Sequence, residues 1–291
     1  MFQTDLLKGK RIFVTGGGTG LGREMVEQYL RLGADIIICG RRGSVLEATA
    51  KELMGQFGGN VSTKVLDIKD PEAVDRVVKE IFEEGDLHGL VNNAAGNFVS
   101  PTKDLSHRGF DAIANIVFHG TFYVTHAVGK NWIERGQKGS IISILVTWVW
   151  TGSPFVVPSA MSKAGLHVMT KSLANEWGRY GIRLNAIAPG PFPTEGAMDR
   201  LHPGQKAWAE QQVKTIPMGR PGEMHELSNL ATFLMADGCE YLTGQTIAID
   251  GARMLTGGDT FSSLSGLSDD DWQQMKAMIQ ATNAKDKAER G

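Results

Sequence analysis

Short apolar runs rich in β-branched residues alternate with longer amphipathic stretches along most of the chain. Runs of this length, bounded by polar segments, are typical of buried strands. Seven of them are predicted as strands: Arg11–Thr15, Ile36–Cys39, Val61–Leu66, Gly89–Val91, Ser140–Val146, Arg183–Ala188 and Thr246–Ile249. Because they are apolar on both faces and are separated by helical patterns, they indicate a parallel sheet covered on both sides. The sequence therefore predicts an α/β protein with a doubly wound, seven-stranded parallel sheet and right-handed crossovers.

Helical patterns fill the intervals between the predicted strands. Residues Gly22–Leu32 repeat apolar side chains at helical spacing, and a helix over 70–84 begins with Asp70 as N-cap and Pro71 at its first position. No shift in composition marks a second domain. Residues 1–291 are therefore predicted as one domain with helices on both faces of its sheet.

Two segments depart from this alternation of strand and helix. Residues 189–222 are rich in proline and follow the sixth strand, where a mobile helical insert over a substrate is expected. The tail 259–291 is serine-rich and becomes helical from Ser268, with three aspartates in its first turn. A docking or oligomer-stabilising tail is the favoured interpretation, and a lid over the substrate is the alternative.

Charge and cysteine content exclude several classes of protein. The 30 Lys and Arg residues against 32 Asp and Glu residues leave a formal charge of −2, which gives no reason to expect a nucleic acid or an anionic membrane as partner. The two cysteines, Cys39 and Cys239, are too few for a disulfide scaffold and are interpreted as buried thiols in a reducing compartment. No apolar run is long enough to span a bilayer and the first ten residues lack a signal sequence, so the default prediction is a cytoplasmic protein.

Glycine is in excess, with 36 residues, and the most informative cluster lies in the segment Thr15–Gly22. This segment reads T-G-G-G-T-G-L-G, directly after the first predicted strand and at the start of a helix. Glycine lets the backbone approach a pyrophosphate closely, and the helix N-terminus offers unpaired N–H groups to it. The loop therefore predicts a dinucleotide-binding site that includes Gly16, Gly18, Thr19, Gly20, Leu21 and Gly22.

The spacing of these glycines is G-x-x-x-G-x-G, and N-N-A-A-G follows the fourth predicted strand at 92–96. With Pro189-Gly190 after the sixth strand, the chain resembles the short-chain dehydrogenase/reductase family from about residue 8 to residue 255. The resemblance implies a Rossmann-type fold. It also implies that the cofactor is contacted by Asn93, Ala94, Gly96, Pro189, Gly190 and Phe192.

The end of the second predicted strand indicates which nicotinamide cofactor is used. An NAD enzyme places an acidic residue there for the ribose diol, whereas this chain has Arg41 and Arg42. Two guanidinium groups suit a 2′-phosphate, so the predicted cofactor is NADP(H). The alternative is that one of the two arginines is a solvated surface charge. By family resemblance, Asp67 hydrogen-bonds the adenine amino group.

The usual catalytic groups of the family are mostly replaced. Lys163 matches the lysine of the Tyr-x-x-x-Lys element, but Ser159 stands at the tyrosine position. Val146 replaces the usual serine and Val117 the usual asparagine. A serine hydroxyl is a much poorer acid than a phenol, so alcohol–ketone chemistry by a Tyr-Lys pair is not expected.

One branch of the family lacks that tyrosine, and the segments 93–98, 151–159, 177–178 and 200–201 resemble it: the 2,4-dienoyl-CoA reductases. The resemblance implies NADPH-dependent reduction of a conjugated dienoyl thioester to an enoyl-CoA, in the β-oxidation of unsaturated fatty acids. Hydride would go to the far end of the diene, and hydrogen-bond donors would stabilise the dienolate at the thioester oxygen. The residue roles that it implies are catalysis for Asn97 and Ser159, the nicotinamide ribose for Lys163, the acyl-CoA for Phe98 and Ser106, and the CoA phosphates for Arg200 and Lys69.

The chain also departs from this branch. Trp148 stands where the mitochondrial form has a catalytic tyrosine, and an indole N–H donates a hydrogen bond without releasing a proton. Val117 stands at the position where the peroxisomal form has a catalytic aspartate. Asp250 matches another acidic residue of that form, and the alternative is that it only makes a turn. An apolar acyl pocket could be lined by Trp148, Trp150, Phe155, Phe192, Met198 and Trp208, although each is individually more typical of a core.

Seven histidines share no metal-ligand spacing, so no metal is predicted, and His119 is the one closest to the usual catalytic asparagine. Three hypotheses remain open: a dienoyl-CoA reductase, a short-chain reductase of another carbonyl or enone, and an NADP(H)-binding protein with little catalysis. The family resemblance further implies a homotetramer built through helices 104–134 and 159–180.

Overall fold

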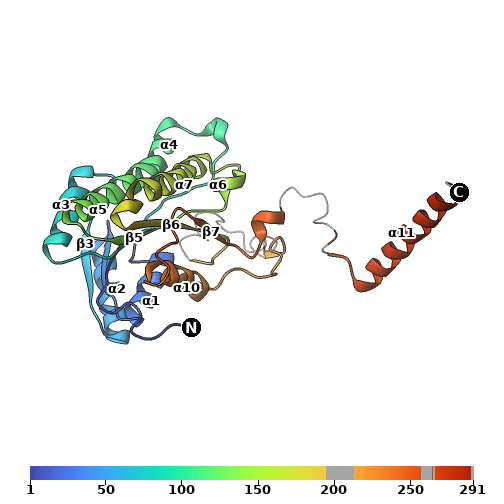
Figure 1. Cartoon of the computed structure of the whole chain (residues 1–291). Helices are drawn as coiled ribbons and strands as arrows, with labels where there is room; N and C mark the ends of the chain where they lie inside the picture. Colours follow the sequence, from blue (N-terminus) through green and yellow to red (C-terminus); the bar gives the residue numbers. More distant parts are fainter. Residues whose placement is uncertain (195–212, 257–263, 265, 290–291) are drawn as a thin grey trace. The chain divides into compact units, whose positions relative to one another are not determined.

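Seven parallel strands form one sheet in the order β3-β2-β1-β4-β5-β6-β7 (Figure 1). The strands are β1 (Arg11–Thr15), β2 (Asp35–Gly40), β3 (Val61–Val65), β4 (Gly89–Asn92), β5 (Gly139–Ile144), β6 (Ile182–Pro189) and β7 (Thr246–Ile249). All seven predicted strands are confirmed, and β1 and β7 have the predicted ends. The prediction extended β5 to Val146, whereas its ladder with β6 stops at Ile144 paired with Ile187. An apolar run does not reveal where interstrand hydrogen bonding ends.

The computed structural model describes residues 1–194, 213–256, 264 and 266–289. Its contacts divide the chain into two compact units, Met1–Met254 and Leu255–Gly291. The sheet belongs to the first unit. Among the described residues, no helix combines the length and the apolar character needed to span a bilayer.

Helices cover both faces of the sheet. On one face lie α1 (Gly20–Arg31), α2 (Gly43–Phe57) and α10 (Met224–Met235), which share a buried apolar cluster with the strands. On the other face lie α3 (Pro71–Glu83), α5 (Thr121–Arg135) and α7 (Val157–Trp177), with a second cluster. This doubly wound arrangement confirms the predicted α/β, Rossmann-type fold.

The shorter and terminal helices complete the described structure. They are η1 (Thr102–Asp104), α4 (His107–Ala114), the π-helix η2 (Asn115–Gly120), α6 (Trp148–Thr151), η3 (Gly178–Tyr180), η4 (Arg253–Thr256) and α11 (Asp269–Glu289). The predicted helix 104–134 therefore begins later, because Ser106 caps α4, and it contains a π-helical segment. The predicted helix 159–180 begins earlier, at Val157, and gives way to η3 after Trp177.

The second unit contains α11, which starts where the sequence predicted. Ser268 N and Ser268 Oγ both donate to Asp271 Oδ2, at 2.9 Å and 2.6 Å, and Asp271 N donates back to Ser268 Oγ at 3.2 Å. The three aspartates Asp269–Asp271 occupy the first turn of this helix. Acidic groups are favourable there because the helix N-terminus carries partial positive charge.

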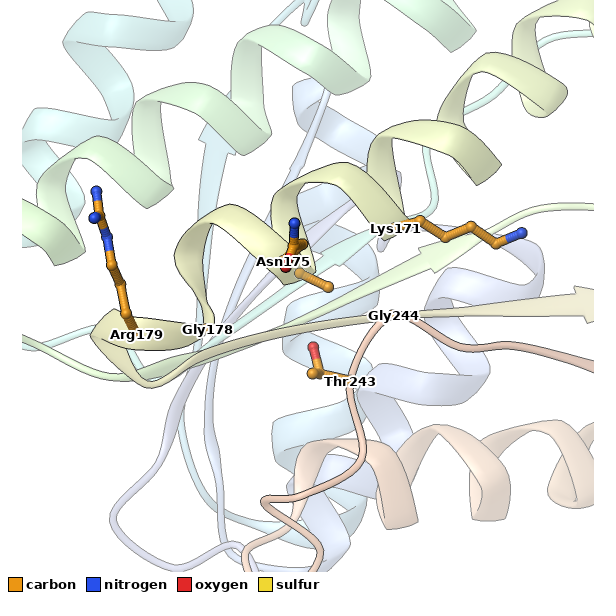
Figure 2. Close-up of a pocket in the computed structure, with 7 residues that line it drawn as sticks. Lys171, Asn175, Gly178, Arg179, Thr243 and Gly244 are labelled. Atoms are coloured by element: carbon orange, nitrogen blue, oxygen red, sulfur yellow. The ribbon is translucent and has the colours of Figure 1, made fainter.

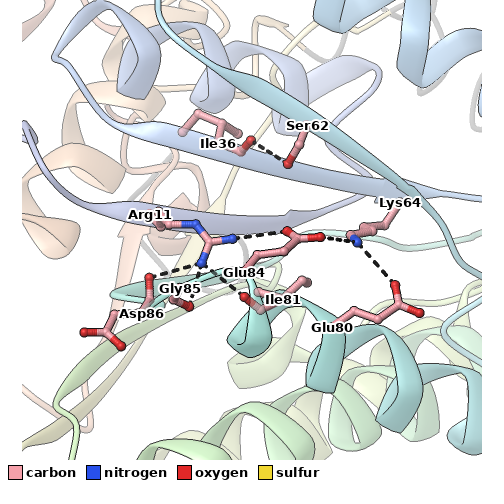
Figure 3. A network of polar contacts seen from close by, with 9 residues as sticks. All are labelled: Arg11, Ile36, Ser62, Lys64, Glu80, Ile81, Glu84, Gly85 and Asp86. Carbon is pink, nitrogen blue, oxygen red and sulfur yellow. Dashed lines mark hydrogen bonds and ion pairs between the residues drawn. The ribbon is translucent and has the colours of Figure 1, made fainter.

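A polar network fixes the C-terminal end of α3 against the sheet (Figure 3). Arg11 of β1 donates to the main-chain oxygens of Ile81 at 3.1 Å and Gly85 at 2.6 Å. Glu84 accepts from Arg11 at 3.3 Å and from Lys64 of β3 at 2.7 Å. The two contacts from Arg11, the first residue of β1, satisfy main-chain carbonyl groups at and just after the end of the helix.

The two cysteines differ in their environments. Cys39 of β2 is fully buried, and burial raises the pKa of its thiol to about 12. Cys239 is only half-buried, in the turn that follows α10, so the prediction of two buried thiols is wrong for this residue. An apolar neighbourhood in the sequence does not bury a residue that the chain places in a turn.

The strand order reverses between β1 and β4. Chain winding runs from β1 outward to β3 on one side and from β4 outward to β7 on the other. In such sheets ligands bind at the carboxyl ends of the strands, in the crevice where the order reverses. The glycine loop after β1 and the N-A-A-G segment after β4 both lie at this point.

Candidate active site and cofactor cleft

The glycine loop after β1 disfavours side chains, by its backbone conformation at some positions and by close packing at others. Gly16 and Gly20 have φ of +66° and +56°, in the left-handed region that favours glycine. A Cβ on Gly22 would lie 2.4 Å from Gly16 O and 2.5 Å from Asn93 Nδ2. The loop is therefore a close-packed cradle of main chain at the start of α1, as a dinucleotide pyrophosphate requires.

Asn93 and Thr15 lock the loops after β1 and β4 together. The Asn93 amide donates to Thr15 O at 3.0 Å and to Gly16 O at 3.2 Å. Thr15 Oγ1 in turn accepts from the main-chain nitrogens of Asn93 and Ala94, each at 3.0 Å. Thr15 was not among the predicted site residues, and its position as the last residue before the glycines was the available signal.

Arg41 and Arg42 follow β2 and are both exposed. Within the described part of the chain neither guanidinium has an ion-pair or hydrogen-bond partner. Arg42 is the N-cap residue of α2 but makes no side-chain capping hydrogen bond. Two unpaired cations thus stand beside the glycine loop, whose Gly16 N donates to Cys39 O at 2.8 Å.

Asp67 lies half-buried after β3, and the structure pairs it with Lys69. Lys69 Nζ lies 3.3 Å from Asp67 Oδ2, and Lys69 N donates to Asp67 Oδ1 at 3.2 Å. The ends of β2 and β3 are adjacent, with Gly40 paired to Val65, so Asp67 and the arginine pair follow neighbouring strand ends. Lys69, predicted for the CoA phosphates, therefore stands next to the residue predicted for adenine.

Lys163 is buried in α7, with 5% of its surface exposed. Its ammonium donates to the main-chain oxygen of Ile144 at the end of β5. Burial lowers the pKa of Lys163 to about 8, because removal from water disfavours the charged form. Ser159 lies one helical turn earlier and is also buried, at 4% exposed. The two predicted residues thus share one face of α7, as their spacing of four requires.

Asn97 and Phe98 lie in the loop after β4. Asn97 Oδ1 accepts a hydrogen bond from Phe98 N at 2.9 Å, which directs the amide NH2 of Asn97 away from that contact. Phe98 packs on a small buried cluster that includes Ile113, Val117 and Leu145. Val117 is fully buried, so apolar packing occupies the position of the usual family asparagine.

Ser106 and Trp148 are placed at helix starts. Ser106 Oγ accepts a hydrogen bond from Gly109 N at 3.1 Å and caps α4. The predicted contact with acyl-CoA would use this same hydroxyl group. Trp148 is the first residue of α6 and is half-buried. Trp150, two residues later, is 42% exposed and meets His167 edge-on with ring centroids 5.7 Å apart.

The segment after β6 is closely packed at its base. Gly190 N donates to Ile249 O at 2.9 Å, and a Cβ on Gly190 would lie 2.6 Å from Asp250 Cβ. Phe192 is 8% exposed and lies against Gly222, where a Cβ would come within 2.3 Å of its ring. Of the predicted residues beyond this point, Arg200, Met198 and Trp208 lie outside the described residues.

Asp250 makes a turn. Its carboxylate accepts hydrogen bonds from Ala252 N at 3.0 Å and Met254 N at 2.7 Å. This is the structural alternative that the Asp-Gly pair suggested. His119 is exposed on η2, and among the described residues no group of three His, Cys, Asp or Glu could hold a metal ion.

A surface hollow of about 510 Å³ lies elsewhere (Figure 2). It is lined by Lys171, Ala174, Asn175, Gly178, Arg179, Thr243 and Gly244. These residues end α7 and precede β6 and β7, so the hollow is at the amino ends of the strands. In Figure 2 the side chain of Lys171 extends to the right and that of Arg179 extends upward at the far left, so the two charged groups lie well apart in this view. The hollow therefore takes no part in the site at the carboxyl ends.

Comparison with known proteins adds three findings. The family model described as enoyl-(acyl carrier protein) reductase matches residues 16–252. A Caenorhabditis elegans protein named probable 2,4-dienoyl-CoA reductase 3 is 40% identical over 294 residues, which cover 99% of this chain and 94% of that protein. A Bacillus subtilis protein named probable 2,4-dienoyl-CoA reductase is 38% identical over 251 residues, covering 86% and 98%.

Among solved structures, a gluconate 5-dehydrogenase from Burkholderia cenocepacia in complex with NADP and tartrate superposes with a TM-score of 0.81. It is 29% identical, and the match covers 87% of this chain and 98% of that chain. The seven-stranded parallel sheet with helices on both faces agrees with this structural match. The protein belongs to the short-chain dehydrogenase/reductase family of oxidoreductases.

Proposed function

We propose that this protein is an NADPH-dependent reductase of 2,4-dienoyl-CoA thioesters. The observation that carries the proposal is a buried pair on one face of α7: the family lysine, Lys163, and Ser159 at the position of the family tyrosine. The resemblance adds Asn97, in the loop after β4, as a second hydrogen-bonding side chain of the site. Donors of this kind suit a reaction in which negative charge develops on a thioester oxygen. The names of the two similar relatives agree with this substrate class.

The residues around the cleft fit NADP(H). The glycine loop offers main chain without side-chain obstruction, and the exposed Arg41 and Arg42 suit a 2′-phosphate at the end of β2. Asp67, after the neighbouring strand β3, would bind the adenine amino group. A solved relative that is 29% identical was crystallised with NADP. When bound, the reduced cofactor supplies the hydride.

Each residue of the site has a separate task in this proposal. Lys163 holds the nicotinamide ribose with its ammonium, which the oxygen of Ile144 already orients. Asn97 and Ser159 donate hydrogen bonds to the thioester oxygen and stabilise the dienolate. Because Asn97 Oδ1 is engaged by Phe98 N, its NH2 is the group available to substrate.

The proton that completes the reduction comes from water in this proposal. Trp148 stands at the tyrosine position of the mitochondrial branch, and its indole N–H donates a hydrogen bond without releasing a proton. Apolar Val117 occupies the place of the peroxisomal aspartate. Catalysis then rests on electrostatic stabilisation by Asn97 and Ser159, with no side chain as general acid.

Substrate contacts follow the same resemblance. Phe98 and Trp148 would contact the acyl part, and Ser106 the acyl-CoA near the start of α4. Lys69 and Arg200 would contact the CoA phosphates. For Lys69 this requires exchange of its ion pair with Asp67, which is favourable only when a phosphate offers more charge than one carboxylate.

A homotetramer is also part of the proposal. Phe118 and Phe122, on η2 and α5, and Met161 and Val168, on α7, are all exposed to between 41% and 59%. The ring of Phe118 lies against Gly165 of α7, so apolar groups of the two helices are continuous. Exposed apolar surface of this kind is typical of a protein interface.

The proposal is tested by NADPH consumption with 2,4-hexadienoyl-CoA. Turnover by the wild type and its loss in Asn97→Ala are expected. Turnover that survives in Asn97→Ala would favour a reductase of another carbonyl or enone. Cofactor binding without turnover would favour an NADP(H)-binding protein that has lost catalysis, for which the replaced tyrosine is the supporting observation.

A further inference from the structure

Phe155 has a backbone conformation that side chains rarely adopt. Its φ is +64°, and among the described residues other than glycine only Ala252, at +68°, shares this left-handed region. For a residue with a bulky side chain this conformation is strained, and such strain is concentrated at functional sites. The ring is nevertheless 54% exposed, so burial in a core does not compensate for the strain.

A hydrogen bond places Phe155 at the proposed site. Ser100 N donates to Phe155 O at 2.8 Å. Ser100 follows Asn97 by three residues in the loop after β4, and Phe155 precedes Ser159 by four residues in the loop after α6. The bond therefore joins the two segments that carry the predicted donors and holds the strained residue between them.

Another exposed apolar residue stands next to this bond. Val99, which precedes Ser100, is 50% exposed. Two loops that leave neighbouring strands, β4 and β5, thus each expose an apolar side chain beside a predicted donor. Glycine would adopt the backbone conformation of Phe155 without strain. The presence of phenylalanine there therefore indicates a role for its aromatic ring.

We propose that Phe155 determines specificity for the acyl chain, with its ring packing on the apolar tail beyond the conjugated carbons. This inference rests on the proposed function. Removing a methylene group from water strengthens binding about fourfold, so a ring that covers the tail makes catalysis depend on chain length. Short dienoyl thioesters end before they reach the ring.

The test compares Phe155→Gly with Ala252→Gly. Both substitutions relieve a positive φ, but only the first removes a ring, so Ala252→Gly is a matched control. For each variant, kcat/KM is measured with 2,4-dienoyl-CoA thioesters of increasing chain length, together with the NADPH dissociation constant. Phe155→Asn serves as a second variant, because asparagine tolerates the left-handed conformation.

In the wild type and in Ala252→Gly, kcat/KM should rise with chain length. In Phe155→Gly and Phe155→Asn it should fall roughly tenfold to twentyfold for the long thioesters, as the loss of about two buried methylene groups at about fourfold each implies. Their kcat/KM for 2,4-hexadienoyl-CoA and their NADPH affinity should stay at the wild-type value.

An unchanged chain-length dependence in Phe155→Gly, or an equal loss at every length, would overturn the inference alone. The proposed function itself fails if the wild type turns over none of the thioesters while NADPH still binds, and the inference then fails with it.

Discussion

Lys163 of α7 donates a hydrogen bond from its buried ammonium to the main-chain oxygen of Ile144 at the end of β5. This contact ties the helix that carries Ser159 to the carboxyl end of the sheet. Burial lowers the pKa of Lys163 to about 8 from the ordinary value of 10.5. A lysine in this state titrates near physiological pH, so its charge has measurable consequences.

Stability without cofactor should depend on pH through Lys163. Between pH 8 and 10.5 the folded protein has released this proton while the unfolded chain keeps it, so the free energy of unfolding rises with pH across that window. A shift of this size corresponds to about 3 kcal/mol. Chemical denaturation at a series of pH values measures the effect.

Lys163→Met is the control for this pH dependence. Its unfolding free energy, subtracted from that of the wild type, isolates the lysine from the other groups that titrate in alkali. The difference should become more favourable to the wild type as pH rises. A difference that is flat from pH 7 to 10.5 would contradict the buried, depressed pKa.

Gly22→Ala should weaken cofactor binding. The added Cβ would lie 2.4 Å from Gly16 O, so the glycine loop must shift, at a cost of about 1–3 kcal/mol for overpacking. The NADPH dissociation constant, from fluorescence titration, should rise roughly tenfold or more. Gly55→Ala in α2 is the control, because nothing lies within 4 Å of its added Cβ. It should raise stability by about 0.5–1 kcal/mol and leave NADPH binding unchanged.

Arg42→Ala should change the choice of cofactor. Hydrogen bonds to a charged phosphate are worth about 1.5–3 kcal/mol, so NADPH affinity should fall roughly tenfold to a hundredfold. NADH affinity should not change, because NADH has no 2′-phosphate. Lys51→Ala, which removes an exposed cation from the same helix α2, controls for general charge. An equal loss of affinity for NADPH and NADH would mean that Arg42 does not bind the 2′-phosphate.

Trp148→Tyr should increase turnover of 2,4-dienoyl-CoA. A positioned general acid contributes about a hundredfold to ten-thousandfold, and a phenol is an acid where an indole is not. We expect a gain in kcat of about a hundredfold or more, the lower end of that range, measured as NADPH consumption. Trp150→Tyr, two residues later and exposed, should have no effect. A gain in kcat in both variants, or in neither, would show that a side chain at position 148 does not donate a proton to the substrate carbon.

The sequence predicted the sheet well and the helices less well. Strands that are apolar on both faces are recognisable one at a time, and seven of them between helices leave few alternatives to a doubly wound sheet. The π-helical segment Asn115–Gly120 was not foreseen, because apolar periodicity over a long helix hides one widened turn. The cap at Ser106 was missed because no glutamate follows it at the third position.

Local sequence motifs identified the individual segments of the candidate site. The contacts between those segments depend on strands that are far apart in the sequence. The glycine loop was recognisable from its place between a strand and a helix. Its lock with Asn93 depends on contact between β1 and β4, which are 78 residues apart at the Asn93–Thr15 bonds. The positive φ of Phe155 had no signal at all, because glycine and asparagine are the residues that usually mark such a backbone.

The most direct test of the proposed activity follows deuterium from reduced, deuterated NADP to 2,4-hexadienoyl-CoA. Mass spectrometry of the product should find a mono-unsaturated thioester with one deuterium on the carbon at the far end of the former diene. An acyl group without deuterium, in a protein that binds the cofactor normally, would contradict the account.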